Sequence, residues 1–220
     1  MSSESRRTPL LANLYQEYLD RHDSDDFARK ASRAYTQGTL ERLSAHDVPL
    51  IRRAAVLALG LLGDYEVNHV IARALHDEDR TVRMLAETGI EGVWRRAGTD
   101  DERQELSAVV ELNSARRFEE AGRRATKLAR KAPWFAEAWH QRAIANHALA
   151  RYNEAIRDCH QALENNPYHF AAAAGMGQAY LQLNNHLAAL EGFRRALRLN
   201  PNLEHVRAQI TRLTRLIEGR

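Results

Sequence analysis

The sequence predicts an all-α protein, a right-handed α-solenoid built of helix-turn-helix repeats. Residues 136–167 align with residues 170–201 at a shift of 34 residues, and residues 48–64 align with residues 79–94 at a shift of 31. Within each segment, small and apolar residues recur every three or four positions, which places them on one face of a helix. A fixed period of this length is typical of stacked repeats, in which each unit buries its apolar face against its neighbours.

Residues 1–38 are expected to form an N-terminal helical cap. Two helices are expected here, and the second begins after Asp23 or Ser24, either of which suits a helix N-cap. Asp23, Asp25 and Asp26 are closely spaced, but the loop lacks the central glycine and the closing glutamate of a calcium site, so we interpret them as capping residues. The first helix carries an apolar stripe of Leu10, Leu11, Leu14, Tyr15, Tyr18 and Leu19, and the second carries Phe27, Ala31 and Tyr35.

Residues 39–98 contain the repeat of 31 residues, in two units, Thr39–Asp64 and Tyr65–Gly98. The aligned pairs are Ile51 with Val82, Arg52 with Arg83, Ala55 with Ala86, and Leu59 with Ile90. Each aligned helix follows an acidic turn, where carboxylates suit a helix N-terminus. This pattern is similar to that of HEAT repeats. The resemblance implies that Arg52 and Arg83 tie neighbouring repeats to the acidic turns.

The joint between the halves is short and contains no flexible linker. Gly98 is a candidate helix C-cap, and Thr99 with Glu102 fits a capping box. Because no Gly/Ser-rich or Pro-rich segment intervenes, the sequence predicts two halves that are continuous or tightly jointed.

Residues 99–201 carry the repeat of 34 residues in three units, the first running from about Glu102 to Pro133. The defining residues are Trp139, Ala143, Tyr152, Ala155 and Pro167 in one unit, and Gly177, Tyr180, Ala189, Phe193 and Pro201 in the next. Phe118, Ala121 and Pro133 take the corresponding places in the first unit. This pattern resembles that of the tetratricopeptide repeat (TPR) family. Residues 202–220 are expected to form a C-terminal capping helix with the apolar stripe Leu203, Val206, Ile210, Leu213 and Ile217.

The TPR resemblance implies a concave groove, lined by the first helix of each repeat, that binds a peptide or helix of another protein. Carried over by register, the groove residues are Asn113, His140, Ile144, His147, Ala171, Ala174, Gln178 and Gln182. Chaperone-binding TPR proteins hold a terminal carboxylate with Lys and Asn at such places, and the His, Ile, Ala and Gln found here argue against that ligand. An alternative for Ala171 and Ala174 is that they are small because helices pack there.

No constellation of residues indicates catalysis. The ten histidines include no pair at HExxH spacing, and the single cysteine, Cys159, falls at a small-residue packing position. No phosphate-binding glycine loop or nucleophile elbow is present. The sequence therefore predicts a non-catalytic interaction scaffold without metal or cofactor.

A second interpretation rests on a basic run between residues 116 and 131. Arg123, Lys127 and Arg130 share a helix face, with Arg116 just before the helix. Such a face suits an anionic partner or nucleic acid, although no aromatic residues interleave it, and a solvated helix surface explains the run equally well. We therefore treat this face as an alternative binding site.

The composition fits a cytoplasmic protein, expected to be a monomer. The net charge is +3, one cysteine allows no internal disulfide, and no apolar run approaches the length of a membrane span. The first residues have no continuous apolar region before Gln16 and Glu17, so we do not expect a signal peptide.

Overall fold

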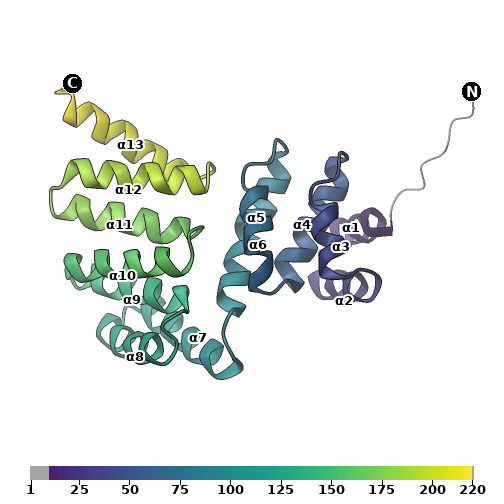
Figure 1. The fold of residues 1–220 in the computed structure, drawn as a ribbon, viewed down its shortest axis with the longest axis horizontal. Coiled ribbons are helices and arrows are strands. Elements are labelled where there is room, and N and C mark those ends of the chain that lie inside the picture. The colour runs from purple at the N-terminus through teal and green to yellow at the C-terminus, as the bar shows by residue number, and fades with distance from the viewer. Residues whose placement is uncertain (1–9, 220) are drawn as a thin grey trace, which may run out of the picture. The chain divides into compact units, whose positions relative to one another are not determined.

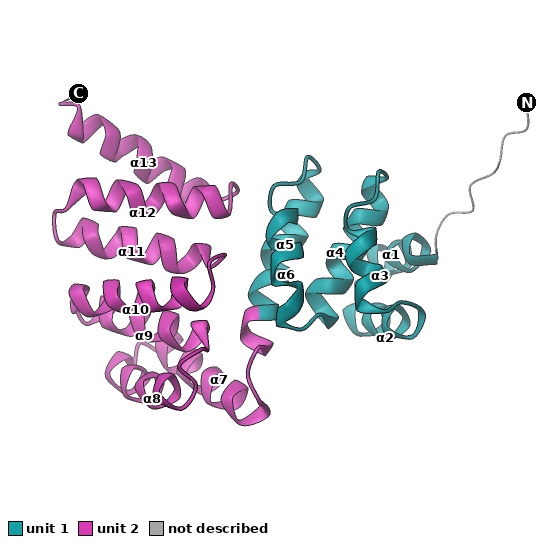
Figure 2. Cartoon of the chain, in the orientation of Figure 1, with its two compact units in different colours: residues 1–93 teal, residues 94–220 magenta. Residues whose placement is uncertain are grey.

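The computed structural model describes residues 10–219, and this part of the chain consists of helices joined by short turns, without strands (Figure 1). The expectation about a signal peptide falls partly on residues 1–9, which lie outside the described residues. The chain divides into two compact units, residues 1–93 and 94–220 (Figure 2). The first contains α1 (Leu10–Arg21), α2 (Ser24–Ala34), α3 (Gln37–Leu43), α4 (Pro49–Leu62), a 3₁₀ turn (Tyr65–Val67), α5 (Asn68–Ala74) and most of α6 (Arg80–Arg96). The second contains α7 (Asp100–Ser114), α8 (Phe118–Lys131), α9 (Ala136–Ala148), α10 (Tyr152–Asn165), α11 (Phe170–Gln182), α12 (His186–Leu199) and α13 (Glu204–Ile217).

The first two helices form as their sequence predicts. Leu11, Leu14 and Tyr15 of α1 are buried, and α1 packs against α2 and α4. Asp23 caps α2, because its side chain accepts a hydrogen bond of 2.9 Å from the backbone N–H of Asp26. The capping interpretation of this acidic loop is therefore confirmed.

The helices α4 and α6 of the first unit approach each other closely at two glycines. A Cβ atom built on Gly60 would lie 2.7 Å from the Cα of Gly89, which leaves no space for any side chain at this position. The two glycines thus allow the backbones to meet where a larger residue would separate the helices.

Arg52 and Arg83 make equivalent contacts one repeat apart. The Nη1 group of each arginine donates hydrogen bonds of 2.9–3.1 Å to two carbonyl oxygens of the acidic turn that precedes its own helix. The acceptors are His46 and Asp47 for Arg52, and Asp77 and Glu78 for Arg83. Each guanidinium thereby satisfies backbone groups at the start of a helix.

Arg52 also joins its own repeat to the next. Its Nε and Nη2 groups donate to both carboxylate oxygens of Asp77 at 2.8 and 2.9 Å, and Nη2 also donates to Glu78 at 3.1 Å. Only 6% of Arg52 is exposed. The contact between neighbouring repeats that the resemblance implied for Arg52 is therefore present, while the assignment of this unit to HEAT repeats stays a prediction.

The second unit is a stack of three antiparallel helix pairs, α7 with α8, α9 with α10, and α11 with α12, followed by α13 on α12. The all-α solenoid of helix pairs is confirmed here. The turn inside each pair contains one residue with left-handed backbone: Arg116, Ala150 and Asn184 have φ values of 58°, 57° and 55°. These residues lie 34 positions apart, so the repeat extends to backbone conformation.

The ends of the helices in this unit follow the predicted signals. Thr99 and Glu102 form the capping box at the start of α7, with both reciprocal hydrogen bonds present. The helices α10 and α12 end immediately before Asn166 and Asn200, whose backbones are extended because each precedes a proline. Both asparagines are fully buried.

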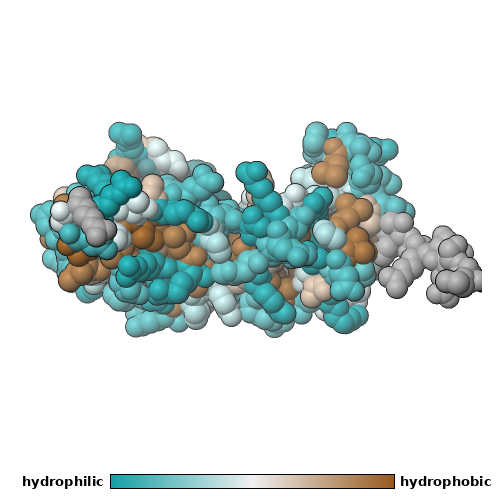
Figure 3. Space-filling model, turned by 90° about the horizontal axis from the view of Figure 1, so that it is seen from above, coloured by the Kyte–Doolittle hydropathy of each residue, from teal (hydrophilic) through white to brown (hydrophobic). Residues whose placement is uncertain are grey.

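The capping helix α13 buries only part of its apolar stripe. Val206 and Leu213 are buried against the stack, whereas Ile217 is exposed. Leu216, which the predicted stripe omits, is also exposed, and Figure 3 shows apolar surface at this end of the unit. Among the described residues, no helix is both long and apolar enough to span a membrane.

Candidate functional site

The first helices of the repeats, α9 and α11, carry most of the side chains that the sequence places in a binding groove. His140, His147, Ala171, Ala174 and Gln178 are half-buried. Ile144 and Gln182 are exposed, and 37% of Ile144 is accessible although it is a large apolar residue. Ala171 and Ala174 retain partial exposure, unlike Ala172 and Ala173, which are fully buried in the same helix.

Asn113 has a different position from the one expected of a groove residue. It is buried, and its Nδ2 group donates to the backbone oxygen and to the side-chain oxygen of Gln141 at 3.0 and 2.9 Å. The asparagine therefore joins α7 to α9, and a partner would have to break these bonds to reach it. The expectation that Asn113 contacts a partner is corrected on this ground.

A buried carboxylate lies at the start of α9. Glu137 is 5% exposed, and its Oε1 atom accepts a hydrogen bond of 2.9 Å from Nε2 of Gln141, one turn further along the helix. Nδ1 of His140 lies 3.4 Å from the same oxygen. Nε2 of His169 lies 3.0 Å from the other oxygen, Oε2. These partners compensate the carboxylate for the loss of water.

His169 connects this cluster to α11. It is the N-cap residue of that helix, and its Nδ1 atom accepts a hydrogen bond of 3.2 Å from the backbone N–H of Ala172. Because Nδ1 is an acceptor, the proton of the neutral ring must be on Nε2, from which it is donated to Glu137. One imidazole thus caps a helix and donates a hydrogen bond to a buried carboxylate in the preceding repeat.

The last residues of α6 cover the histidine. The ring of Trp94 stacks on that of His169, with centroids 4.4 Å apart, and packs at 5.2 Å against Phe170. The His140 ring lies 4.5 Å from the His169 ring. Trp94 is 2% exposed, so the indole closes the cluster from water.

The charge state of the cluster follows from this environment. Burial raises the pKa of Glu137, but the hydrogen bonds from His140 and His169 help to outweigh this effect, and the pKa lies well below its usual range. Burial lowers the pKa of His169, and the opposing effect of Glu137 is smaller. The cluster therefore contains an ionised Glu137 beside a neutral His169.

The same three side chains can be tested as a metal site. One ligand atom each from Glu137, His140 and His169 lies within 4.8 Å of the others, which would suit a small cation after slight adjustment. A metal ion on Nε2 of His169 would leave the ring proton on Nδ1, directly opposed to the N–H of Ala172. The capping bond would be lost, so the donor set does not fit a metal and is better described as a hydrogen-bonded network.

Of the three residues in this cluster, only His140 is among those that the sequence places in the groove. Glu137 precedes it by one turn, whereas His169 lies 29 residues later and cannot be paired with it by spacing alone. A signal was present in the repeat, since His169 stands 34 residues after Phe135 and 34 before Leu203, both buried. A histidine at a position otherwise occupied by apolar residues predicts burial and a need for partners.

The alternative basic face lies on α8 and the turn before it. Arg116, Arg123, Lys127 and Arg130 are all exposed, and none of them forms an ion pair with another described residue. Other cations of the run are paired: Arg117 with Glu120, Arg124 with Glu105, and Lys131 with Asp101. The basic run between residues 116 and 131 contains seven cations, and four of them are therefore without an ion-pair partner among the described residues.

Cys159 has the environment of a packing residue. It is buried, and burial raises the pKa of its thiol to about 12. A thiol with so high a pKa is protonated near neutral pH and is a poor nucleophile.

Comparison with known proteins agrees with this architecture. Residues 146–213 match the family model described as a tetratricopeptide repeat. A TPR repeat-containing protein of Rhizobium etli is 28% identical over 87 residues, which cover 40% of this chain and 43% of the relative. The matched part thus spans less than half the length of that relative.

Two solved structures illustrate the similarity in fold. The TPR2AB domain of yeast Sti1, in its complex with pHSP90, has a TM-score of 0.48 at 19% identity, with 92% of this chain and 88% of the other covered. YrrB, a TPR protein described as having an unusual peptide-binding site, has a TM-score of 0.46 at 17% identity, with coverages of 88% and 95%. Within the second unit, residues 146–213 are thus similar in sequence to tetratricopeptide repeats.

Proposed function

We propose that this protein is a non-catalytic scaffold that binds a peptide or a helix of another protein on the face formed by α9 and α11. The observation that carries the proposal is the exposure of Ile144 on α9, together with the small and amide side chains that remain accessible on α11. Ala171, Ala174 and Gln178 follow one another at helical spacing and all remain partly accessible. Small residues let a ligand backbone approach, and amides can fix its register.

The packed cluster limits where this ligand can bind. Glu137 and His169 are buried, and Trp94 stacks on His169, so Glu137 at the start of α9 is not available to a ligand. The accessible surface lies further along the helices, at Ile144 of α9 and at Gln178 and Gln182 of α11. The proposed site therefore excludes Asn113 and the first turn of α9.

Substitution of Ala174 tests this site. Partners would be isolated by affinity capture with the full chain and identified by mass spectrometry, and their binding would be remeasured with purified components. We expect A174R to weaken binding more than about tenfold, or roughly 1.4 kcal/mol, because bulk and charge cover the surface. The melting temperature should change little, since arginine is a good helix former.

The matched control is A115R, which adds the same side chain in the exposed turn after α7. Unchanged binding by A174R would place the partner elsewhere. A large loss of helicity in A174R would instead mean that Ala174 is required for packing between helices.

The free cations of α8 favour a second candidate function, the binding of an anionic partner or nucleic acid. Arg123, Lys127 and Arg130 are exposed, share one face and lack carboxylate partners among the described residues. Retention on heparin or RNA at physiological ionic strength, lost in the R123Q/K127Q/R130Q variant, would support it. Elution of the unmodified protein at low salt would rule it out.

A further inference from the structure

Two clefts in the second unit occupy equivalent positions, one repeat apart. The first lies among α8, α9 and α10, and the second among α10, α11 and α12. Six residues that line the first cleft have counterparts 34 positions later in the second. The pairs are Thr126 and His160, Arg142 and Met176, Asn146 and Tyr180, Glu154 and Ala188, Arg157 and Glu191, and Asp158 and Gly192. The fold therefore builds the same hollow twice with different side chains.

The first cleft is occupied by its own ion pairs. Arg142 donates to both carboxylate oxygens of the buried Asp158, at 2.9 and 2.5 Å, and Asn146 donates to Asp158 at 2.9 Å. Across the opening, Arg151 pairs with Glu119 at 2.7 Å. These polar groups satisfy one another and leave a volume of about 310 Å³.

The second cleft lacks the residues that form this network. Met176, Tyr180 and Gly192 replace Arg142, Asn146 and Asp158, so its floor is apolar. Its volume is about 710 Å³. A Cβ atom on Gly192 would lie 2.9 Å from the Cα of Gly177. The two helices therefore pack too closely for an aspartate side chain at position 192.

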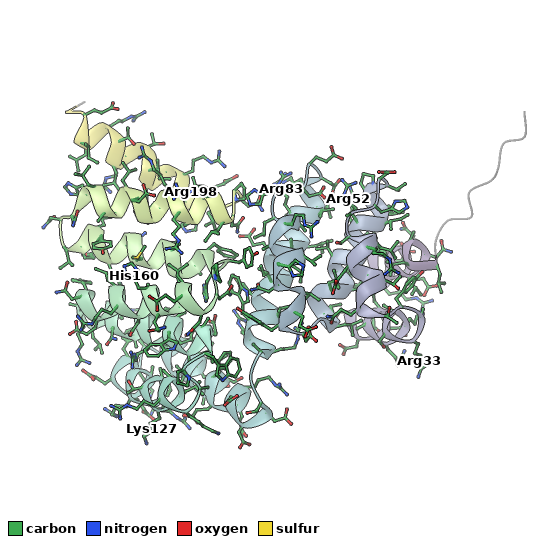
Figure 4. The ribbon with its side chains drawn as sticks, in the orientation of Figure 1. Arg33, Arg52, Arg83, Lys127, His160 and Arg198 are labelled. Carbon is green, nitrogen blue, oxygen red and sulfur yellow. The ribbon has the colours of Figure 1, made fainter. Side chains whose placement is uncertain are left out.

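The rim of the second cleft is basic. Arg195 lines it and forms no ion pair with another described residue. Arg198 lines it too and pairs with Glu191 at 2.8 Å, but both side chains are more than 60% exposed, and so open a pair contributes little stability. His160 on α10 and Arg198 on α12 (labelled in Figure 4) are both exposed.

We propose that this α10–α12 cleft binds an acidic peptide segment that inserts one large apolar side chain. The apolar floor at Met176 and Tyr180 would receive that side chain, and Arg195 and Arg198 would pair with acidic residues beside it. A volume of this size suits a ligand of several residues, with burial of an apolar anchor and charge complementarity at the rim. The site lies outside the surface proposed above for partner binding, so the two can fail independently.

Methionine labelling gives a local readout. The chain has only three methionines, Met1, Met84 and Met176. With ¹³C-methyl methionine in the full chain, the Met176 methyl reports on the cleft floor, and the exposed Met84 of α6 serves as an internal reference. The probe is a synthetic peptide with one phenylalanine between two runs of glutamate. We expect it to shift the Met176 signal in a saturable manner and to leave the Met84 signal unchanged.

The rim is tested by transferring residues from the preceding repeat. Residues 161 and 164, which correspond to Arg195 and Arg198, are Gln161 and Glu164, so R195Q/R198E introduces side chains that this fold already accepts. We expect the dissociation constant for the peptide to rise more than about tenfold. The control R33Q, which removes an exposed arginine of α2 outside every proposed binding surface, should bind as the unmodified protein does. If circular dichroism shows that the double variant is misfolded, R195Q alone replaces it.

Three results would overturn the proposal. The first is a Met176 signal that does not move at millimolar peptide. The second is an equal shift with a peptide in which glutamine replaces glutamate, or alanine replaces phenylalanine. The third is an unchanged dissociation constant in R195Q/R198E. An A174R variant that still binds the acidic peptide, while it loses the captured partner, would separate this cleft from the α9–α11 surface.

Discussion

Arg52 and Arg198 each pair with a carboxylate, but their surroundings give the two pairs different weight. The Arg52 side chain and its partner Asp77 are 8% and 13% exposed, and Arg52 makes five hydrogen bonds to three side-chain and two backbone acceptor atoms. Removal of either partner would leave a desolvated charge. Arg198 is exposed to water, which compensates for the loss of its partner. Burial thus decides which arginine holds the fold together and which is free to bind.

The first prediction concerns Arg52. We expect R52A to lower the free energy of unfolding by about 3–5 kcal/mol, because Asp77 is left buried without its partner. Urea unfolding followed by far-UV circular dichroism measures this loss. The control R33A removes an exposed arginine of α2 and should change stability by no more than about 0.5 kcal/mol. Equal effects of the two variants would mean that the buried pair contributes nothing.

The second prediction is a dependence of stability on pH that arises from His169. Its pKa is lowered in the folded state, so the unfolded chain binds more protons as pH falls below the ordinary value of about 6.5. The contribution of His169 to the free energy of unfolding is fully present above that pH. Below it, this contribution decreases by at most about 1.4 kcal/mol per pH unit, because one proton is involved. The lowered pKa of Glu137 also makes the free energy of unfolding decrease as pH falls, but only at more acidic pH, below the ordinary pKa of a glutamate.

The H169N variant isolates the part of the pH dependence that arises from His169. Asparagine can still cap α11 but does not titrate. Unfolding by urea between pH 7 and pH 5, followed by tryptophan fluorescence, should give a smaller decrease in stability for H169N than for the unmodified protein. H160N, at an exposed histidine of α10, should retain the original dependence. An unchanged slope in H169N would assign the effect to other histidines.

At the scale of the element, the repeat predicted the fold better than it predicted the site. The capping box of Thr99 and the prolines after Asn166 and Asn200 are local signals, and helices begin and end at these places in the structure. The Glu137–His169 contact joins residues 32 positions apart and depends on how repeats stack, which spacing on one helix does not encode. Asn113 shows the same limit, since its contact with Gln141 joins residues 28 positions apart and was not predicted from the sequence.

The third prediction concerns the end of α6. Trp94 packs on His169 and Phe170, and Ala97 packs on the apolar cluster around Leu106 and Phe135. This segment therefore belongs to the core of the second unit. We expect W94A to lower the free energy of unfolding by about 3–5 kcal/mol, as is usual for a buried aromatic residue. Urea unfolding measures it, with L187A at a 69% exposed leucine as the control expected to change little.

For the whole molecule, the decisive feature is that α6 contains the division between the units. The helix runs from Arg80 to Arg96, and the division falls between Val93 and Trp94. Val82, Ala86 and Ile90 are buried in the part that belongs to the first unit, and Trp94 is buried in the second. Since helix formation is cooperative, loss of one end of α6 weakens the other. The short joint that the sequence indicated at residues 97–102 thus follows a helix that is shared by both units.

The fourth prediction is that the two units unfold together. Far-UV circular dichroism reports helices of both units, whereas all three tryptophans, Trp94, Trp134 and Trp139, lie in the second. If α6 couples the units, the urea transitions from the two methods should coincide. Insertion of two glycines between Val93 and Trp94 should separate them, because each glycine costs a helix interior about 1 kcal/mol and the insertion shifts the helix register. Transitions that are already separate in the unmodified protein would show that the units are independent, and then W94A should affect only the fluorescence-detected step.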